Sequence, residues 1–121
     1  MAVALVAAVA LLVAPALALR IGGTPGPDRL HGGKRGDRIH GRAGDDRLSG
    51  RRGNDIVAGD EGADRLIGGP GFDQLRGGPG GDLISARDGE PDRIACGPGY
   101  DRAVVDRTED GVIDCEEVIE P

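Results

Sequence analysis

Aspartates recur at every ninth residue between Asp28 and Asp82, and this spacing is the strongest chemical signal in the chain. The series consists of Asp28, Asp37, Asp46, Asp55, Asp64, Asp73 and Asp82. A fixed period of this kind predicts a solenoid, in which each unit buries its apolar side only against its neighbours. The repeated carboxylates would therefore stack above one another.

Stacked carboxylates favour a cation between successive coils. Neighbouring strands of a sheet lie ~4.8 Å apart, so aligned Asp side chains would repel one another without a positive ion. Calcium takes about six to eight oxygen ligands and mixes carboxylates with backbone carbonyls, which glycine-rich turns leave accessible. Transition metals prefer His or Cys ligands, and the repeats contain no Cys. We therefore predict that several calcium ions bind.

Seven gapless blocks of nine residues, from 23 to 85, must position these carboxylates. Every block starts with Gly, and we expect the glycines at its first and fourth positions to allow turns with φ > 0. The eighth position is always aliphatic and should point inward from a short extended segment. These residues are Leu30, Ile39, Leu48, Val57, Leu66, Leu75 and Ile84. Two blocks would form one coil, so alternate blocks would stack on opposite sides.

The blocks resemble a known repeat family. GGPGFDQLR (68–76) and GGPGGDLIS (77–85) match the pattern G-G-x-G-x-D-x-U-x, in which U is a large aliphatic residue, at every defined position. This is the repeat of the RTX or haemolysin-type calcium-binding proteins. The resemblance implies an all-β fold, a parallel β-roll, in which the sixth-position Asp side chains and the turn carbonyls hold calcium. Block two has Arg35 at the fourth position, so its turn is expected to bind more weakly.

The period slips after Ser85 but continues. Residues 86–95 fit with one extra residue, which places Asp92 at the sixth position, and residues 96–104 place Asp101 there. We therefore add Asp92 and Asp101 to the predicted calcium ligands. We divide the chain into a calcium-binding roll at 19–95 and a capping segment at 96–121, because the last coil of a solenoid needs an atypical unit to cover it.

Cys96 and Cys115 are the only cysteines, and we predict that they form one disulfide that pins the capping segment to the roll. The alternative, a reactive thiol or Cys nucleophile, is less favoured because no His lies nearby in the sequence. A second pattern overlaps this segment. Residues 106–117 resemble an EF-hand loop, but Thr108 stands at a ligand position and the flanks leave little room for helices. An acidic cap with a short helix or strand is the preferred interpretation.

Residues 1–18 are apolar throughout and end in Ala16-Leu17-Ala18, which reads as a secretory signal peptide. No Lys or Arg precedes the apolar run, and an uncleaved anchor of marginal length is the alternative. A secreted, extracellular protein is the prediction. With millimolar calcium outside the cell, weak sites of ~10⁻⁴–10⁻³ M would order the chain there.

The formal net charge of −6 argues against nucleic acid or an anionic membrane as partners. Arg nevertheless follows the Asp in four of the seven blocks, at Arg29, Arg38, Arg47 and Arg65. These residues could form a basic stripe for an acidic polymer, or they could be outward-facing residues that offset their Asp neighbours. We favour the second interpretation.

Three classes of function follow from these patterns. The leading hypothesis is an exported protein that binds calcium and folds on binding it. An enzyme is disfavoured, because the two serines, Ser49 and Ser85, occupy repeat positions and no nucleophile–base set is readable. An adhesion or matrix spacer with an unknown surface partner is the alternative, although the flat aromatic or Thr ladders that would favour it are missing.

Overall fold

The computed structural model describes residues 18–106 and 111–120. The predicted signal peptide therefore lies, except for Ala18, outside the described residues. Every element in the described part is a three-residue strand. The strands are β1 (Arg20–Gly22), β2 (Arg29–His31), β3 (Arg38–His40), β4 (Arg47–Ser49), β5 (Ile56–Ala58), β6 (Arg65–Ile67), β7 (Gln74–Arg76), β8 (Leu83–Ser85), β9 (Arg93–Ala95), β10 (Arg102–Val104), β11 (Gly111–Ile113) and β12 (Glu117–Ile119). No described segment is a helix of the length and apolar character that crossing a membrane would require.

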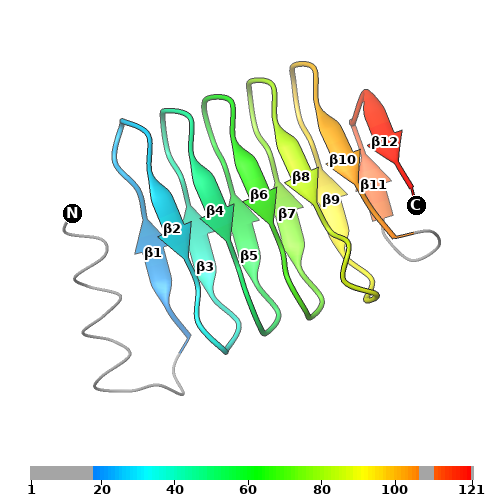
Figure 1. Ribbon diagram of the computed structural model, residues 1–121. Coiled ribbons are helices and arrows are strands. Elements are labelled where there is room, and N and C mark those ends of the chain that lie inside the picture. The colour runs from blue at the N-terminus through cyan, green and yellow to red at the C-terminus, as the bar shows by residue number, and fades with distance from the viewer. Residues whose placement is uncertain (1–17, 107–110, 121) are drawn as a thin grey trace.

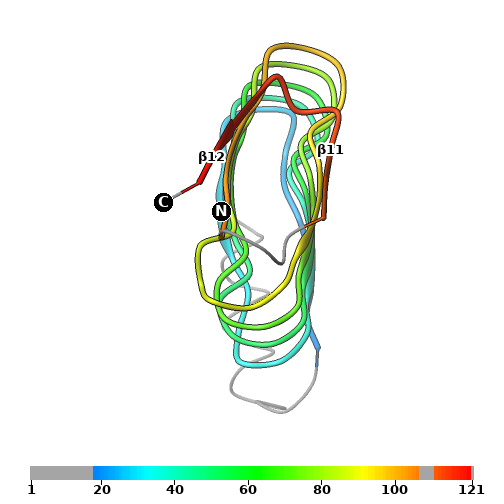
Figure 2. The same ribbon diagram turned by 90° about the vertical axis from the view of Figure 1, so that its right-hand side faces the viewer.

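The strands form two parallel six-stranded sheets that face each other. Odd-numbered strands make one sheet, sheet A, in the order β1-β3-β5-β7-β9-β11, and even-numbered strands make the other, sheet B. Figure 1 shows the coils following one another along a single axis, and Figure 2, viewed near that axis, shows the two sheets as the long walls of a flattened ring. The predicted parallel β-roll, with alternate blocks on opposite sides, is confirmed.

The strand register follows the nine-residue period. Ile39 pairs with Val57 and Val57 with Leu75, so each eighth-position residue lies beside the one from the next coil of its sheet. Leu75 pairs with Ile94, nineteen residues later, because the extra residue in block eight is absorbed in the turn. The strands therefore stay in register across the irregular block.

The core is a single ladder of these aliphatic side chains on each sheet. Ile39, Val57, Leu75 and Ile84 are fully buried, and the neighbouring aliphatic residues are almost as inaccessible. The first and third residues of most strands point outward, which is the alternation expected of a sheet with one covered face. Such a thin core leaves the turns to contribute much of the stability.

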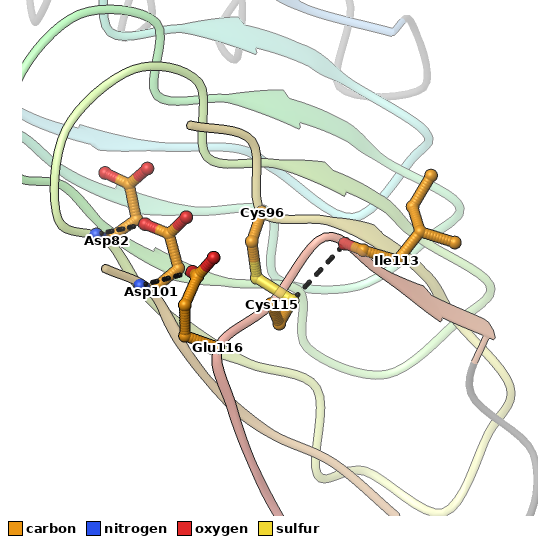
Figure 3. The surroundings of a disulfide bond; sticks show 6 residues. All are labelled: Asp82, Cys96, Asp101, Ile113, Cys115 and Glu116. Atoms are coloured by element: carbon orange, nitrogen blue, oxygen red, sulfur yellow. Dashed lines mark hydrogen bonds between the residues drawn. A yellow bond between two sulfur atoms is a disulfide. The ribbon is translucent and has the colours of Figure 1, made fainter. Parts of the chain in front are cut away.

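Residues after Cys96 continue both sheets and close the roll. β10 pairs with β8 and β12, and β11 pairs with β9. The predicted disulfide joins Cys96 to Cys115 and ties the last coil to the one before it (Figure 3). Val112 and Cys115 pack against the core, whereas Val118, on the end strand of sheet B within the described residues, is 44% exposed.

The EF-hand-like segment, residues 106–117, contributes β11 and the start of β12 to the last coil. Gly111, at the sixth position of that pattern, begins β11, and Glu117, at the twelfth, begins β12 and pairs with Arg102. The acids and the Thr at its third to fifth positions lie outside the described residues.

Candidate metal centre

Each sixth-position Asp stands directly before a strand, where the turn enters the sheet. The eight residues from Asp37 to Asp101 in this series are buried, with at most 3% of each side chain exposed, and Asp28 is half-buried. The two stacks of carboxylates expected from the sequence are therefore present, one beside each sheet, and they lie inside the roll.

One carboxylate oxygen of each Asp links neighbouring coils. On sheet A, Oδ1 of Asp55 accepts the backbone N–H of Asp37 at 2.8 Å, and Oδ1 of Asp73 accepts that of Asp55 at 2.7 Å. The same bond recurs along sheet B and ends at Glu116, whose Oε1 accepts the N–H of Asp101 at 2.9 Å (Figure 3). These bonds stabilise the carboxylate positions without any cation.

The second carboxylate oxygen divides the blocks into two groups. In blocks one and two, Oδ2 of Asp28 and of Asp37 accepts the N–H of the second-position residue, at 2.6 Å from Thr24 and 2.5 Å from Gly33. In blocks three to seven and in the block of Asp101, Oδ2 is buried and accepts no hydrogen bond within the described residues. These residues are Asp46, Asp55, Asp64, Asp73, Asp82 and Asp101. A buried charged oxygen without a partner costs free energy that a bound cation would recover.

Glycine at the first position makes room for this oxygen. A methyl group on Gly68 would lie 2.5 Å from Oδ2 of Asp73, and the other six first-position glycines have the same relation to their own Asp. None of the seven has a left-handed φ. The expectation that these glycines supply φ > 0 is therefore wrong, since their role is to leave out a Cβ.

Left-handed conformations occur at the fourth position, where they were expected, and also at the second position. Gly44, Gly53 and Gly62 at the fourth position have φ of 95°, 100° and 123°. At the second position, Arg42 and Arg51 both have φ of 71°, a conformation in which a residue with a Cβ is strained. Blocks one and two have no left-handed residue at either position. These are the two blocks in which Oδ2 of the Asp accepts the N–H of the second-position residue.

In five of the seven gapless blocks, a backbone carbonyl oxygen of the neighbouring coil borders the same space as Oδ2. The space that a Cβ on Gly41 would fill is bounded by Oδ2 of Asp46 and by the carbonyl oxygen of Gly59, the latter 2.7 Å from the Cβ position. At Gly77 the corresponding carbonyl belongs to Cys96, at 2.5 Å. Carboxylate and carbonyl oxygens thus converge between coils, and a donor set of oxygens alone suits calcium.

Burial raises the pKa values of these carboxyl groups. It raises the pKa of Asp55 to about 8, chiefly because the charged form loses its water, with further contributions from the charges of Asp73 and Asp37. The pKa values of Asp64 and Asp82 rise to about 7 for the same leading reason. A carboxylate that is costly to charge in isolation gains strongly from a nearby divalent cation.

Block eight contains an acidic residue that the sequence analysis missed. Asp88 lies with Asp73 and Asp92 in a group in which one carboxylate oxygen from each residue lies within 4.8 Å of the others. Its turn is held by Asp106, whose Oδ2 accepts the N–H of Asp88 at 2.9 Å. The signal that could have revealed Asp88 is the extra residue in block eight, together with Ala86 in place of the first glycine.

The fold and the buried carboxylate oxygens place the chain in the class of repeat proteins that form a parallel β-roll with candidate cation ligands between the coils. The chain belongs to the family of the RTX calcium-binding nonapeptide repeat, whose pattern, described as four copies, matches residues 22–57 and 58–90, more than half of the chain. This match confirms the resemblance and indicates calcium binding. No curated protein and no solved structure matched the chain significantly.

Proposed function

We propose that this protein is an exported, non-catalytic calcium-binding protein whose roll becomes stable when several calcium ions occupy the turns. The observation that carries the proposal is the row of buried Oδ2 atoms in blocks three to seven, which have no hydrogen-bond partner within the described residues. In blocks three, five and seven a backbone carbonyl oxygen of the neighbouring coil borders the same space as Oδ2. Asp46, Asp55, Asp64, Asp73 and Asp82 would supply one carboxylate oxygen each to the bound ions. Asp92 and Asp101 would extend the two rows.

Calcium would supply positive charge beside the carboxylates of blocks three to seven. The ion pairs His40–Asp60 and Arg102–Glu117 do not include Asp46, Asp55, Asp64, Asp73 or Asp82. A ligand that binds only the folded chain stabilises it by mass action, so folding should follow the free calcium concentration. Asp28 and Asp37, with both oxygens already hydrogen-bonded, are expected to contribute least.

The disulfide supports the extracellular part of the proposal, because such bonds persist mainly in oxidising compartments. We also propose that the chain has no catalytic activity. Ser49 and Ser85 stand at the ends of β4 and β8 on the outer face of sheet B, and neither forms a hydrogen bond to a base within the described residues.

A calcium titration of the mature, oxidised chain tests the proposal. Circular dichroism and native mass spectrometry should show several ions binding together with a gain of strand structure, reversed by a chelator. Magnesium is the matched control, because its demand for a small octahedral site makes it a poor substitute. A chain that is equally folded in chelator and in millimolar calcium, with no ions bound, would contradict the proposal.

A further inference from the structure

The outer face of sheet B carries a row of arginines that the calcium sites do not use. Arg29, Arg47 and Arg65 are the first residues of β2, β4 and β6, and the parallel register places Arg47 directly between the other two. All three are exposed. Like charges that face each other on neighbouring strands destabilise a sheet, so this arrangement calls for a reason.

Within residues 18–106 and 111–120, Arg29, Arg47 and Arg65 form no ion pair. Their preceding residues, Asp28, Asp46 and Asp64, direct their carboxylates to neighbouring backbone N–H groups of the turns, and none of them pairs with an arginine. The preference for arginines that offset their Asp neighbours is therefore not supported by any contact. Farther along the same row, Arg102 does have a partner, because its Nε lies 3.0 Å from Oε2 of Glu117.

The charge of the chain is divided along the axis of the roll. Ten of the fifteen Lys and Arg residues lie between Arg20 and Ile67, against eight of the twenty-one acids. Five of those eight acids are sixth-position Asp residues, which are buried or half-buried and so contribute little negative charge to the surface. The surface of the first half is therefore basic, although the net charge of the whole chain is −6. The net charge of the whole chain therefore does not describe the charge of this surface.

A shallow groove runs beside the arginine row. It is lined by the three arginines and by the third residues of the same strands, His31, Ser49 and Ile67. The groove crosses β2, β4 and β6, so its positive charges recur at the strand spacing of ~4.8 Å. Burial lowers the pKa of His31, and the positive charges of Arg51 and Arg29 lower it further.

We propose that this groove, the arginine groove, binds a linear acidic polysaccharide whose charged groups lie along Arg29, Arg47 and Arg65. An extended polymer with a charge on successive sugars complements a straight row of cations, and the planar guanidinium groups suit carboxylate or sulfate oxygens. Single-stranded nucleic acid is the weaker match. It binds by stacking bases on aromatic rings, and the chain's two aromatic residues, Phe72 and Tyr100, lie outside the groove.

Binding of dextran sulfate to the calcium-loaded, oxidised protein tests this proposal, with uncharged dextran and a single-stranded oligonucleotide as comparison polymers. The triple variant Arg29→Gln, Arg47→Gln, Arg65→Gln should lose at least about tenfold in affinity and should show a weaker salt dependence. The matched control is Arg76→Gln, Arg87→Gln, Arg93→Gln. It removes the same charge from exposed positions elsewhere and should stay within about twofold of the wild type.

Three results would overturn the proposal. These are failure of the wild type to bind dextran sulfate above dextran, equal losses in the two triple variants, and tighter binding of the oligonucleotide at equal charge. Circular dichroism of all three proteins with calcium verifies that they share one fold. If the wild type neither binds calcium nor changes its circular dichroism with calcium, the proposed function is contradicted. The comparison of the two triple variants would still test whether the arginine groove binds the polymer.

Discussion

Oδ2 of Asp64 lies against the Cα of Gly59, five residues earlier in the same block, where a Cβ would otherwise stand. The same relation holds in all seven gapless blocks and explains why their first and sixth positions do not vary within this chain. The glycine leaves the space, and the carboxylate fills it. The spacing of the two residues is therefore a packing requirement as well as a property of the metal centre.

Gly59→Ala should destabilise the calcium-loaded roll through a steric clash. The new methyl would overlap Oδ2 of Asp64 and would lie 2.8 Å from the carbonyl oxygen of Gly77, which belongs to a paired coil and cannot move freely. We expect a loss of about 1–3 kcal/mol in urea denaturation, the usual cost of overpacking, and weaker calcium binding. Gly26→Ala is the control, because its nearest neighbouring atom would be 3.8 Å away. Equal stabilities of the two variants would refute the steric explanation.

The calcium-free protein should be more stable in mild acid than at alkaline pH. The folded pKa values of Asp55, Asp64, Asp73 and Asp82 are raised to between about 6 and about 8, from 3.8. The folded state therefore holds more protons than the unfolded chain between about pH 4 and pH 8, and its stability falls as pH rises through that window. Urea midpoints in chelator at pH 5 and pH 8 measure this.

Calcium should reverse this pH dependence, because protons and calcium compete for the same carboxylates. Calcium affinity is expected to increase from pH 5 to pH 8 in isothermal titration calorimetry. A calcium-free chain whose urea midpoint rises with pH over this range would show that these Asp residues are charged in the folded state.

Replacing Arg42 or Arg51 with Gly should stabilise the protein. Both residues have φ of 71°, where a Cβ crowds the backbone, and relief of this strain should add about 1 kcal/mol each after the entropic cost of glycine is subtracted. Arg52→Gly is the control, since Arg52 has no left-handed φ and should gain nothing. Chemical denaturation in saturating calcium gives the comparison. A loss of stability at Arg42 equal to that at Arg52 would contradict the strain argument.

Asp88→Asn should weaken one calcium site and leave the others intact. Oδ1 of Asp88 accepts the N–H of Glu90 at 2.8 Å, a bond that the amide oxygen of Asn can keep, so the substitution removes charge and preserves the turn. We expect about a tenfold loss in affinity at one site, measured by calorimetry. Asp45→Asn, another charge-removing change in a turn, should behave as wild type. If both variants bind like the wild type, Asp88 is not a ligand.

Much of the fold could be predicted because the repeat unit is short and local. Gly68, Asp73 and Leu75 stand at set distances along the chain, and an 18-residue coil follows directly from two such blocks. The single extra residue in block eight was also recognisable, because Asp92 and Ile94 resume the period after it. The disulfide followed from the presence of two cysteines in a chain expected to be exported.

The details of the site could not be predicted in the same way. Whether Oδ2 of a sixth-position Asp accepts a backbone N–H, as in Asp37, or accepts none, as in Asp55, accompanies the φ of turn residues that the repeat pattern leaves open. Asp88 joins Asp73 only because a neighbouring coil, eighteen or nineteen residues away, brings the two turns together. The arginines could be aligned from the sequence, but the absence of a partner for Arg47 depends on where every nearby carboxylate points.

By itself, the sequence determined the period, the alternation of blocks between two sheets, the inward aliphatic ladder and the family. The sequence determines these features because they depend on residues close together in the chain. In a regular repeat each unit packs against a similar unit, so the local pattern also fixes the stacking. Only the tertiary structure decided that the carboxylates point into the roll and that Gly59 is needed because a Cβ there would overlap Oδ2 of Asp64. It also decided that Arg29, Arg47 and Arg65 lie exposed on one face without an ion-pair partner in the described part of the chain. Those outcomes depend on distances between coils, which arise only when the coils stack.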